Sequence, residues 1–254
     1  NNLGSSLRNL NKQNEAIDNY NLAIKINPNF SDAYSNRSSV LIDFGEYQKA
    51  IESCNQAINI NPNQSEAFFN KGLALQKIGK IEESIHSYKQ AIKIKPSYLA
   101  SYINLAMVMH KSGLIDEAIQ NYNFAIKIKP DCSEAYLSLG TIFREQGYLK
   151  KSEENFNLAI QFKPDSFDAY NNLGVLLQES GRFDEAKQKY KNAMQIKPSN
   201  GDTHFNYSII SKYKKGSNTL KLLQDAYSDT NIDNHNSMLI SFALAKAYDD
   251  IGEY

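Results

Sequence analysis

The sequence predicts an all-α fold, a right-handed superhelical solenoid of antiparallel helix pairs with about 34 residues in each pair. The first observation is the spacing of the prolines: all six lie 34 residues from the next, at Pro28, Pro62, Pro96, Pro130, Pro164 and Pro198. The second is a set of glycines at the same spacing, and the third is the helical periodicity of the apolar residues between them. A fixed period of this length indicates a repeat array.

One copy of the unit, residues 167–200, shows how the pair is built. Its first half places apolar and small residues at i, i+3, i+4 and i+7, which is one face of a helix: Tyr170, Leu173, Gly174 and Leu177. Gly181 ends this helix, because glycine adopts the left-handed conformation without a Cβ clash. The second half repeats the spacing with Ala186, Tyr190, Ala193 and Met194. Pro198 prevents its continuation, so the unit is a helical hairpin.

The same pattern runs through the chain. The predicted helix-ending residues are Asn11, Gly45, Gly79, Gly113, Gly147 and Gly181. Small residues recur in the second helix, where two helices must approach closely, at Ala16, Ala50, Ser84, Ala118, Ser152 and Ala186. Four residues later stand Tyr20, Cys54, Tyr88, Tyr122, Phe156 and Tyr190. We therefore expect Cys54 to be a buried small hydrophobe and not a nucleophile.

The domain organisation follows from this register. Residues 1–200 are expected to form six regular units, the first of them incomplete, and residues 201–254 a divergent seventh repeat and the start of a truncated eighth. Within the second region we expect a helix over 220–227, a polar break over 228–236 and a helix over 239–250 that Gly252 ends. Arrays of this kind need polar caps, so more repeats or another domain are expected beyond Tyr254.

An aromatic-x2-Leu-Gly-x2-Leu run followed by Gly, Ala, an aromatic residue, Ala and Pro resembles the tetratricopeptide repeat. The resemblance covers residues 1–200. Tyr or Phe stands where that family often has Trp, and Arg37-Ser38 and Lys71-Gly72 vary the Leu-Gly pair. The resemblance implies a protein–protein interaction scaffold. We expect this chain to be no enzyme and to carry no catalytic residue, metal site or cofactor.

Composition excludes several classes of partner. The 28 basic and 28 acidic residues cancel, so nothing points to nucleic acid or to an anionic membrane. No apolar run approaches the roughly 18 residues of a membrane helix. Cys54 and Cys132 make no metal or redox spacing, which favours a reducing, cytoplasmic-type compartment. The first residue is not Met, so a targeting segment upstream stays open. No two of the histidines have metal-ligand spacing: His86, His110, His204 and His235.

The candidate binding residues come from the face of each first helix that packing does not use. Positions in the unit are numbered so that residues 31, 65, 99, 133, 167 and 201 are position 1. Positions 4, 7, 8 and 11 are expected to pack, and positions 2, 6, 9 and 13 point away from them. In the family that this chain resembles, that face lines a concave groove. Position 6 reads Asn2, Asn36, Asn70, Asn104, Ser138, Asn172 and Asn206.

Asparagine is a poor helix former, but its amide offers a donor and an acceptor, the complement of a peptide unit. The predicted peptide-binding residues are therefore Asn2, Asn36, Asn70, Asn104, Asn172 and Asn206, one in each repeat except the fifth, which has Ser138, and they hold an extended polypeptide by its backbone. Two alternatives stay open: the asparagines steady the stack, or they are inherited from duplication of one unit. Phe69 and Phe205 at position 5 either anchor a partner's side chain or pack across repeats.

This series of asparagines resembles the asparagine ladder of O-linked N-acetylglucosamine transferases, where it docks protein substrates. Residues 242–254 are weakly similar to the last repeat of proteins that join such repeats to a sulfotransferase domain. These resemblances imply an alternative function, the substrate-docking or spacer region of a larger transferase whose catalytic domain lies outside this chain.

A second groove chemistry of the family, the carboxylate clamp that binds chaperone C-termini, is not expected. Residues 34–38 look like its middle member, but Asn1 and Ser5 stand where Lys and Asn are needed. Glu66 and Asn70 stand where Lys and Arg are needed. Self-association through the array ends stays open.

Overall fold

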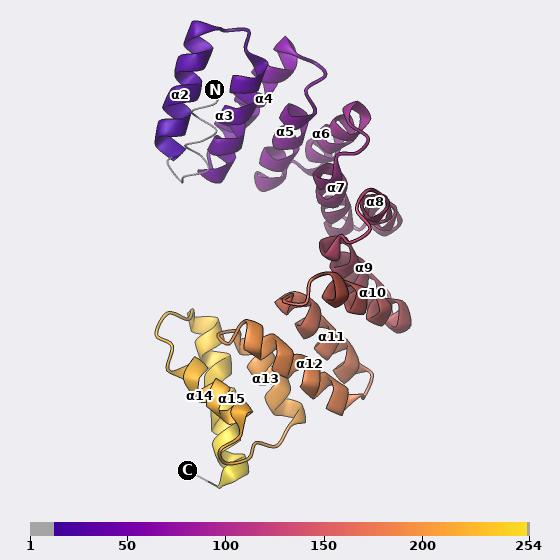
Figure 1. Cartoon of the computed structure of the whole chain (residues 1–254), viewed down its shortest axis with the longest axis vertical. Coiled ribbons are helices and arrows are strands. Elements are labelled where there is room, and N and C mark those ends of the chain that lie inside the picture. The colour runs from indigo at the N-terminus through magenta and orange to yellow at the C-terminus, as the bar shows by residue number, and fades with distance from the viewer. Residues whose placement is uncertain (1–12, 253–254) are drawn as a thin grey trace. The chain divides into compact units, whose positions relative to one another are not determined.

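The chain folds as a succession of helices in a computed structural model that describes residues 13–252 (Figure 1). This range contains fourteen helices and no strand, so the all-α helix-pair repeat fold is confirmed. The predicted residues Asn2 and Asn11 lie outside the described range. The chain divides into two compact units, 1–130 and 131–254, and each is described by itself.

Unit 1 contains one second helix followed by three complete hairpins. The second helix of the first repeat is α2 (Gln13–Ile26). The hairpins pair α3 (Ser31–Asp43) with α4 (Tyr47–Ile60), α5 (Ser65–Lys77) with α6 (Ile81–Ile94), and α7 (Leu99–Lys111) with α8 (Ile115–Ile128). Each second helix of these hairpins packs along its own first helix, and α4 and α6 also pack on the first helix that follows.

Unit 2 contains two further regular hairpins and three helices that depart from the pattern. The hairpins pair α9 (Ser133–Glu145) with α10 (Leu149–Phe162), and α11 (Phe167–Glu179) with α12 (Phe183–Ile196). Then follow α13 (Gly201–Ile210), α14 (Asn218–Tyr227) and α15 (Asn234–Ile251). Helix α13 packs on α12 and α15, whereas α14 packs on α15.

Glycine ends each regular first helix, as expected. Gly45 has φ 77°; its N–H donates to the Ile42 carbonyl at 3.0 Å, and the Glu46 N–H donates to the Leu41 carbonyl at 2.9 Å. This pair of bonds is the Schellman motif, which satisfies the last carbonyls of the helix and requires a left-handed residue. Gly79, Gly113, Gly147 and Gly181 have φ between 72° and 78°.

In the hairpins that have glycine at position 8, the backbone of the first helix lies against an aromatic ring of the second helix. A Cβ added to Gly72 would lie 2.7 Å from the Tyr88 ring, and one added to Gly174 would lie 2.6 Å from the Tyr190 ring. The second-helix residues that were predicted to be small and buried are fully buried, as is Cys54. Burial raises the pKa of the Cys54 thiol to about 11, so the thiolate is disfavoured and the side chain behaves as a hydrophobe.

The buried face of the first helices is wider than the sequence predicted. Positions 3 and 10 are buried in every regular hairpin of the described chain, for example Ala33 and Val40 in α3 and Ala169 and Leu176 in α11. Position 4, expected to be buried, is only partly so in these hairpins. The reason is that a first helix contacts its own second helix and also the neighbouring repeats. Position 6 lies about 60° from position 3 and is therefore at the edge of the buried face.

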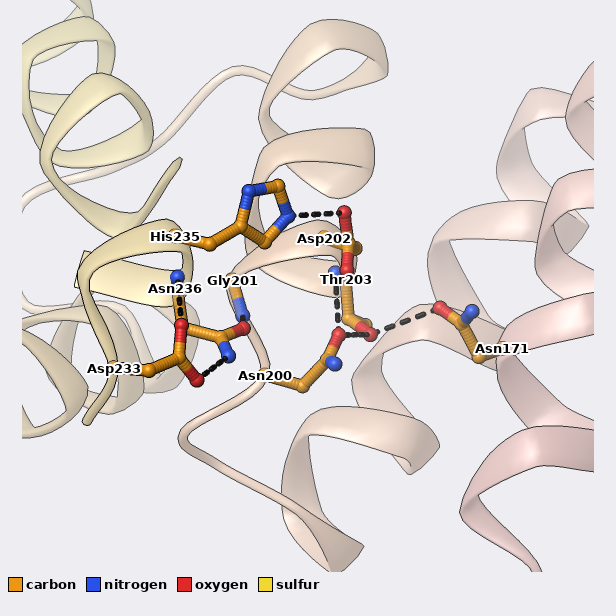
Figure 2. A network of polar contacts seen from close by, with 8 residues as sticks. All are labelled: Asn171, Asn200, Gly201, Asp202, Thr203, Asp233, His235 and Asn236. Atoms are coloured by element: carbon orange, nitrogen blue, oxygen red, sulfur yellow. Dashed lines mark hydrogen bonds and ion pairs between the residues drawn. The ribbon is translucent and has the colours of Figure 1, made fainter. Parts of the chain in front are cut away.

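Helix α15 begins earlier than predicted, at Asn234 and not at 239. The Asp233 carboxylate caps this helix by accepting from the Asn236 backbone N–H at 2.9 Å. The Asn236 side-chain oxygen accepts from the Gly201 N–H at 2.6 Å (Figure 2). A Cβ added to Gly201 would meet the Asn236 carbonyl oxygen at 2.6 Å. The polar residues expected to form a break thus join the start of α15 to the start of α13.

The linker between α13 and α14 is held by α15. Lys246 Nζ donates to the Ser211 carbonyl at 2.9 Å and pairs with Asp250. The Asp250 carboxylate also accepts from the Tyr213 N–H at 3.0 Å. Although burial opposes it, hydrogen bonding to Lys246 and Tyr213 leaves the pKa of Asp250 below its usual value. The linker therefore has fixed backbone contacts in place of a last helical turn.

We expect Gly174→Ser to destabilise unit 2 by about 1–3 kcal/mol, because an added Cβ overpacks the Tyr190 ring. In the second repeat Ser38 occupies the same position opposite Cys54. The loss of stability from Gly174→Ser should therefore be smaller in a Tyr190→Cys background. Urea unfolding of the wild type, the two single variants and the double variant measures this in a double-mutant cycle. An equal cost in both backgrounds would contradict this contact.

We expect His204 to make unit 2 less stable at acid pH. The ring is fully buried, its Nε2 lies 2.8 Å from the Pro198 carbonyl and so carries the proton, and its Nδ1 has no partner. Burial lowers the pKa of His204, against the opposing effect of the Pro198 bond. The unfolded chain therefore takes up the proton at higher pH. This contribution to stability is complete above the unfolded pKa of about 6.5 and is lost as pH falls through the lower native pKa.

The measurement is the free energy of unfolding of the wild type and of His204→Phe across that range. Phe68 stands at the same position of the third repeat, so phenylalanine fits the pattern of the array. The variant should show a weaker dependence on pH below about 6.5. The same slope in both chains would mean that His204 does not control the acid sensitivity.

Candidate functional site

In unit 1 two of the predicted asparagines line one cavity. Asn36 on α3 and Asn70 on α5 border a cavity of about 380 Å³ on the side of these helices that carries position 6. Its other lining residues are Ser35, Ser39, Ile42, Asp43, Glu66, Phe69, Leu73 and Tyr98. The position-6 residues of these two neighbouring repeats therefore border a common space.

Asn70 also takes part in the packing of the array. Only 8% of the residue is exposed. Its Nδ2 donates to the Ser35 carbonyl and lies within hydrogen-bond distance of the Ser38 hydroxyl, both at 3.1 Å. Both acceptors belong to α3, so this amide nitrogen joins two repeats. The amide oxygen has no hydrogen bond within the described residues, and Asn70 lines the cavity.

Asn104, the third predicted residue of this unit, is half-buried on α7. Its Nδ2 donates to the Ala100 carbonyl of the same helix at 2.9 Å. This bond lies within one helix and joins no repeats. It leaves the second N–H of the amide and the amide oxygen for other partners.

Aromatic residues form one wall of the unit 1 cavity. The Phe69 ring lies 5.1 Å from the Tyr98 ring and 5.8 Å from the Tyr88 ring. Phe69 thus packs within its own repeat, against α6 and the residue that precedes α7, and neither of the two roles considered for it is tested by these contacts. Glu66 lies 3.6 Å from Lys95, whose ammonium is 5.0 Å from the Tyr98 ring centre. Burial, and secondarily Glu66, raise the pKa of Tyr98 to about 12, so the phenol stays protonated.

In unit 2 the predicted residues Asn172 and Asn206 are half-buried on α11 and α13. Neither amide makes a hydrogen bond within the described part of the chain. Packing between these helices uses the preceding residue, Asn171, whose amide oxygen lies 2.9 Å from the Thr203 hydroxyl (Figure 2). Ser138 holds the same position on α9 and is also half-buried. Phe205 is half-buried as well.

Arg37, the basic residue of the clamp-like segment, lies on another face. Its Nη1 donates to the Asn21 amide oxygen at 2.8 Å, and its Nε to the Ser53 hydroxyl at 3.2 Å. It lines a cavity of about 550 Å³ with residues of α2 and α4, whereas Asn36 lines the cavity described above. Desolvation lowers the pKa of Arg37. Asn36 and Arg37, neighbours in the clamp-like segment, thus line different cavities.

Residues 13–252 include no cluster of three or more histidine, cysteine or acidic side chains that could hold a metal ion. In the same range no helix is long and apolar enough to span a membrane. Of the histidines, His204 packs in the core, and His86 and His235 are exposed.

Sequence reasoning missed Tyr98, Ile42 and Leu73 as lining residues of the unit 1 cavity. Tyr98 stands at the last position of its repeat and lies outside the first helix, whose outward face supplied the predicted binding residues. Position 9, which holds Leu73, was placed on the correct face, and its apolar character was the available signal. Ile42 at position 12 had no such signal, because this position is beside the packing residues.

The described chain is thus a series of helical hairpins, and position 6 recurs on one side of their first helices. Sequence models of the tetratricopeptide repeat match residues 65–98 and 167–200, and 4–41, 39–79, 110–147 and 140–181. Together these matches cover well over half of the chain. The chain belongs to the tetratricopeptide-repeat family.

Solved structures show the same fold at low identity. YrrB, described as a tetratricopeptide-repeat protein with an unusual peptide-binding site, is 19% identical over 70% of this chain and 92% of its own, with a TM-score of 0.58. A MamA protein is 23% identical over 65% and 91%, with a TM-score of 0.58. PilF of Pseudomonas aeruginosa is 15% identical over 86% and 92%, with a TM-score of 0.67. Curated protein sequences give no significant match.

Replacing two asparagines at the same position should have different effects on stability. Asn70→Ala removes the contacts of the amide nitrogen with the Ser35 carbonyl and the Ser38 hydroxyl, although the Ser38 hydroxyl still donates to that carbonyl, so we expect a loss of about 1 kcal/mol. Asn172→Ala removes no hydrogen bond, and alanine is the better helix former, so stability should be unchanged or slightly higher. Thermal unfolding of both variants measures this, and equal effects would contradict the assignment.

Proposed function

We propose that this chain is a protein-interaction scaffold that binds extended polypeptide segments on the asparagine-bearing face of its first helices. The observation that carries the proposal is the shared cavity of Asn36 and Asn70 in unit 1. A space bordered by amides from successive repeats can accept a backbone that runs past both of them. The likeness in fold to YrrB, described as having a peptide-binding site, supports the same class of ligand.

The chemistry of recognition is hydrogen bonding to peptide groups. Each amide–peptide bond contributes on the order of 0.5–1.5 kcal/mol net, and ordering a flexible ligand opposes binding. A few such bonds give micromolar-class affinity at most. Because peptide groups are common to all sequences, the asparagines give affinity with little sequence preference, and selectivity comes from side-chain contacts around them.

The alternative, a docking or spacer region of a larger transferase, uses the same face and differs only in what the chain is joined to. It rests on the resemblance of the asparagine series and of residues 242–254. No contact of the described residues favours it over a free-standing scaffold. In both functions the asparagines bind a polypeptide segment.

The test is binding of the purified chain to an array of unrelated extended peptides. The variant is Asn172→Ala with Asn206→Ala, because neither amide supports the packing of the described chain. The matched control is Asn171→Ala, whose side chain bonds to Thr203 within the array. We expect the double variant to lose most binding across the array and the control to retain it.

Folding of each variant is checked by circular dichroism and thermal unfolding. A second variant, Asn36→Ala with Asn104→Ala, makes the same test in unit 1. If both double variants are folded and bind as the wild type does, the asparagines are structural or inherited and the proposal is wrong.

A further inference from the structure

The seventh repeat lacks the last turn of its first helix. Helices α3, α5, α7, α9 and α11 have 13 residues each, whereas α13 has 10. Position 11 of the earlier repeats is apolar: Leu41, Leu75, Met109, Phe143 and Leu177. In the seventh repeat it is Ser211, which has extended backbone angles outside the helix and whose carbonyl is held by Lys246.

The missing turn leaves an apolar cavity of about 520 Å³ in unit 2. It is lined by Gln178, Glu179, Phe183, Ile209 and Ile210. Phe183 is 49% exposed and Ile209 57% exposed, and both line this cavity.

Unit 1 shows what fills this place in a regular repeat. Leu75, at position 11 of α5, packs in one cluster with Tyr47, which holds the place in α4 that Phe183 holds in α12. The cavity therefore has an apolar lining and ample room for one large apolar side chain, and no side chain of residues 13–252 fills it.

The cavity adjoins the proposed peptide-binding face. Ile209 follows Asn206 by three residues on α13, and Glu179 follows Asn172 by seven on α11, so each pair lies on one side of its helix. A segment bound to the two asparagines passes the mouth of the cavity.

The charges on the first helices of unit 2 specify the partner further. Helices α9, α11 and α13 carry the carboxylates of Glu134, Glu145, Asp168, Glu179 and Asp202, and a single arginine, Arg144. In unit 1, the first helices α3, α5 and α7 carry three carboxylates and four Lys or Arg side chains.

Acidic residues in a first turn are explained by the helix dipole. Glu145 and Glu179 lie in the last turn, where the dipole disfavours them. Glu179 pairs with Arg144 at 2.9 Å and remains 47% exposed at the cavity edge. A basic segment complements this surface.

We propose that the Phe183–Ile209–Ile210 cavity binds one large apolar side chain of an extended, Lys- or Arg-rich polypeptide whose backbone lies along Asn172 and Asn206. This inference rests on the proposed function and assigns a partner class to its unit 2 face. The asparagines hold the backbone, the cavity selects the apolar residue, and the carboxylates select basic neighbours.

The test uses the full chain and three fluorescein-labelled extended dodecapeptides in anisotropy titrations. The first contains Lys, Ser and Gly with one central Leu, the second has Ala in place of Leu, and the third has Glu in place of Lys. At low salt we expect the Leu peptide to bind about tenfold tighter than the Ala peptide, from the apolar area that it buries. The Glu peptide should bind at least about tenfold weaker than the Leu peptide, and added salt should reduce that difference.

Ile209→Asn should reduce the Leu-to-Ala ratio to about one. The matched control is Ile196→Asn, at the far end of α12, where the side chain is 38% exposed; it should keep the ratio. Asn172→Ala with Asn206→Ala should weaken both peptides equally and keep the ratio.

Equal binding of the Leu and Ala peptides to the wild type, or an unchanged ratio in Ile209→Asn, overturns the cavity assignment and leaves the asparagine proposal standing. Tighter binding of the Glu peptide overturns the charge assignment. If no peptide in this set or in the array binds, the proposed function itself fails.

Discussion

The close approach of the two helices in each hairpin is the contact on which the rest of the array depends. Position 8 must be small because an aromatic ring of the second helix lies against the backbone there, as Tyr190 does at Gly174. Where the second helix has serine in place of alanine, its hydroxyl donates to the position-8 carbonyl, as Ser84 does to Gly72 at 2.8 Å. Because the left-handed glycine fixes the turn, the two helices of each regular hairpin pair in the same register, and position 6 recurs at the same place of each first helix.

This geometry allows a position-6 side chain both to pack and to bind a ligand. At the edge of the buried face it can reach the neighbouring first helix and can also face outward. Asn70 bonds to α3 through its nitrogen, leaves its oxygen without a bond and lines the cavity, whereas Asn172 has neither atom bonded within the described chain. A structural role and a binding role are therefore not exclusive. They are divided between atoms of one side chain in unit 1 and between neighbouring residues, Asn171 and Asn172, in unit 2.

The hairpins were predictable because prolines, glycines and small residues each act locally, and their common period removes ambiguity about register. Other features depended on contacts that one repeat does not encode. Burial at positions 3 and 10 comes from neighbouring repeats. The early start of α15 comes from a cap by Asp233 in a segment that is polar in sequence. The cavity residue Tyr98 is brought to the site by the turn that precedes α7, which helical periodicity does not describe.

The seventh repeat shows where the array departs from its own rule. Shortening α13 forgoes apolar contacts at position 11, and the linker is secured by polar contacts from Lys246 and Asp250 instead. In regular repeats the apolar residue at position 11 packs into the core, as Leu41 and Leu75 do. An apolar residue at position 211 would therefore have continued the pattern of the array. Local departures from a consistent pattern concentrate at functional sites. This departure lies beside Asn206 and adjoins an apolar cavity bordered by α11 and α13, the helices that carry Asn172 and Asn206. The asparagines repeat and so carry little selectivity, whereas the cavity occurs in one repeat and can fix the register of a bound segment.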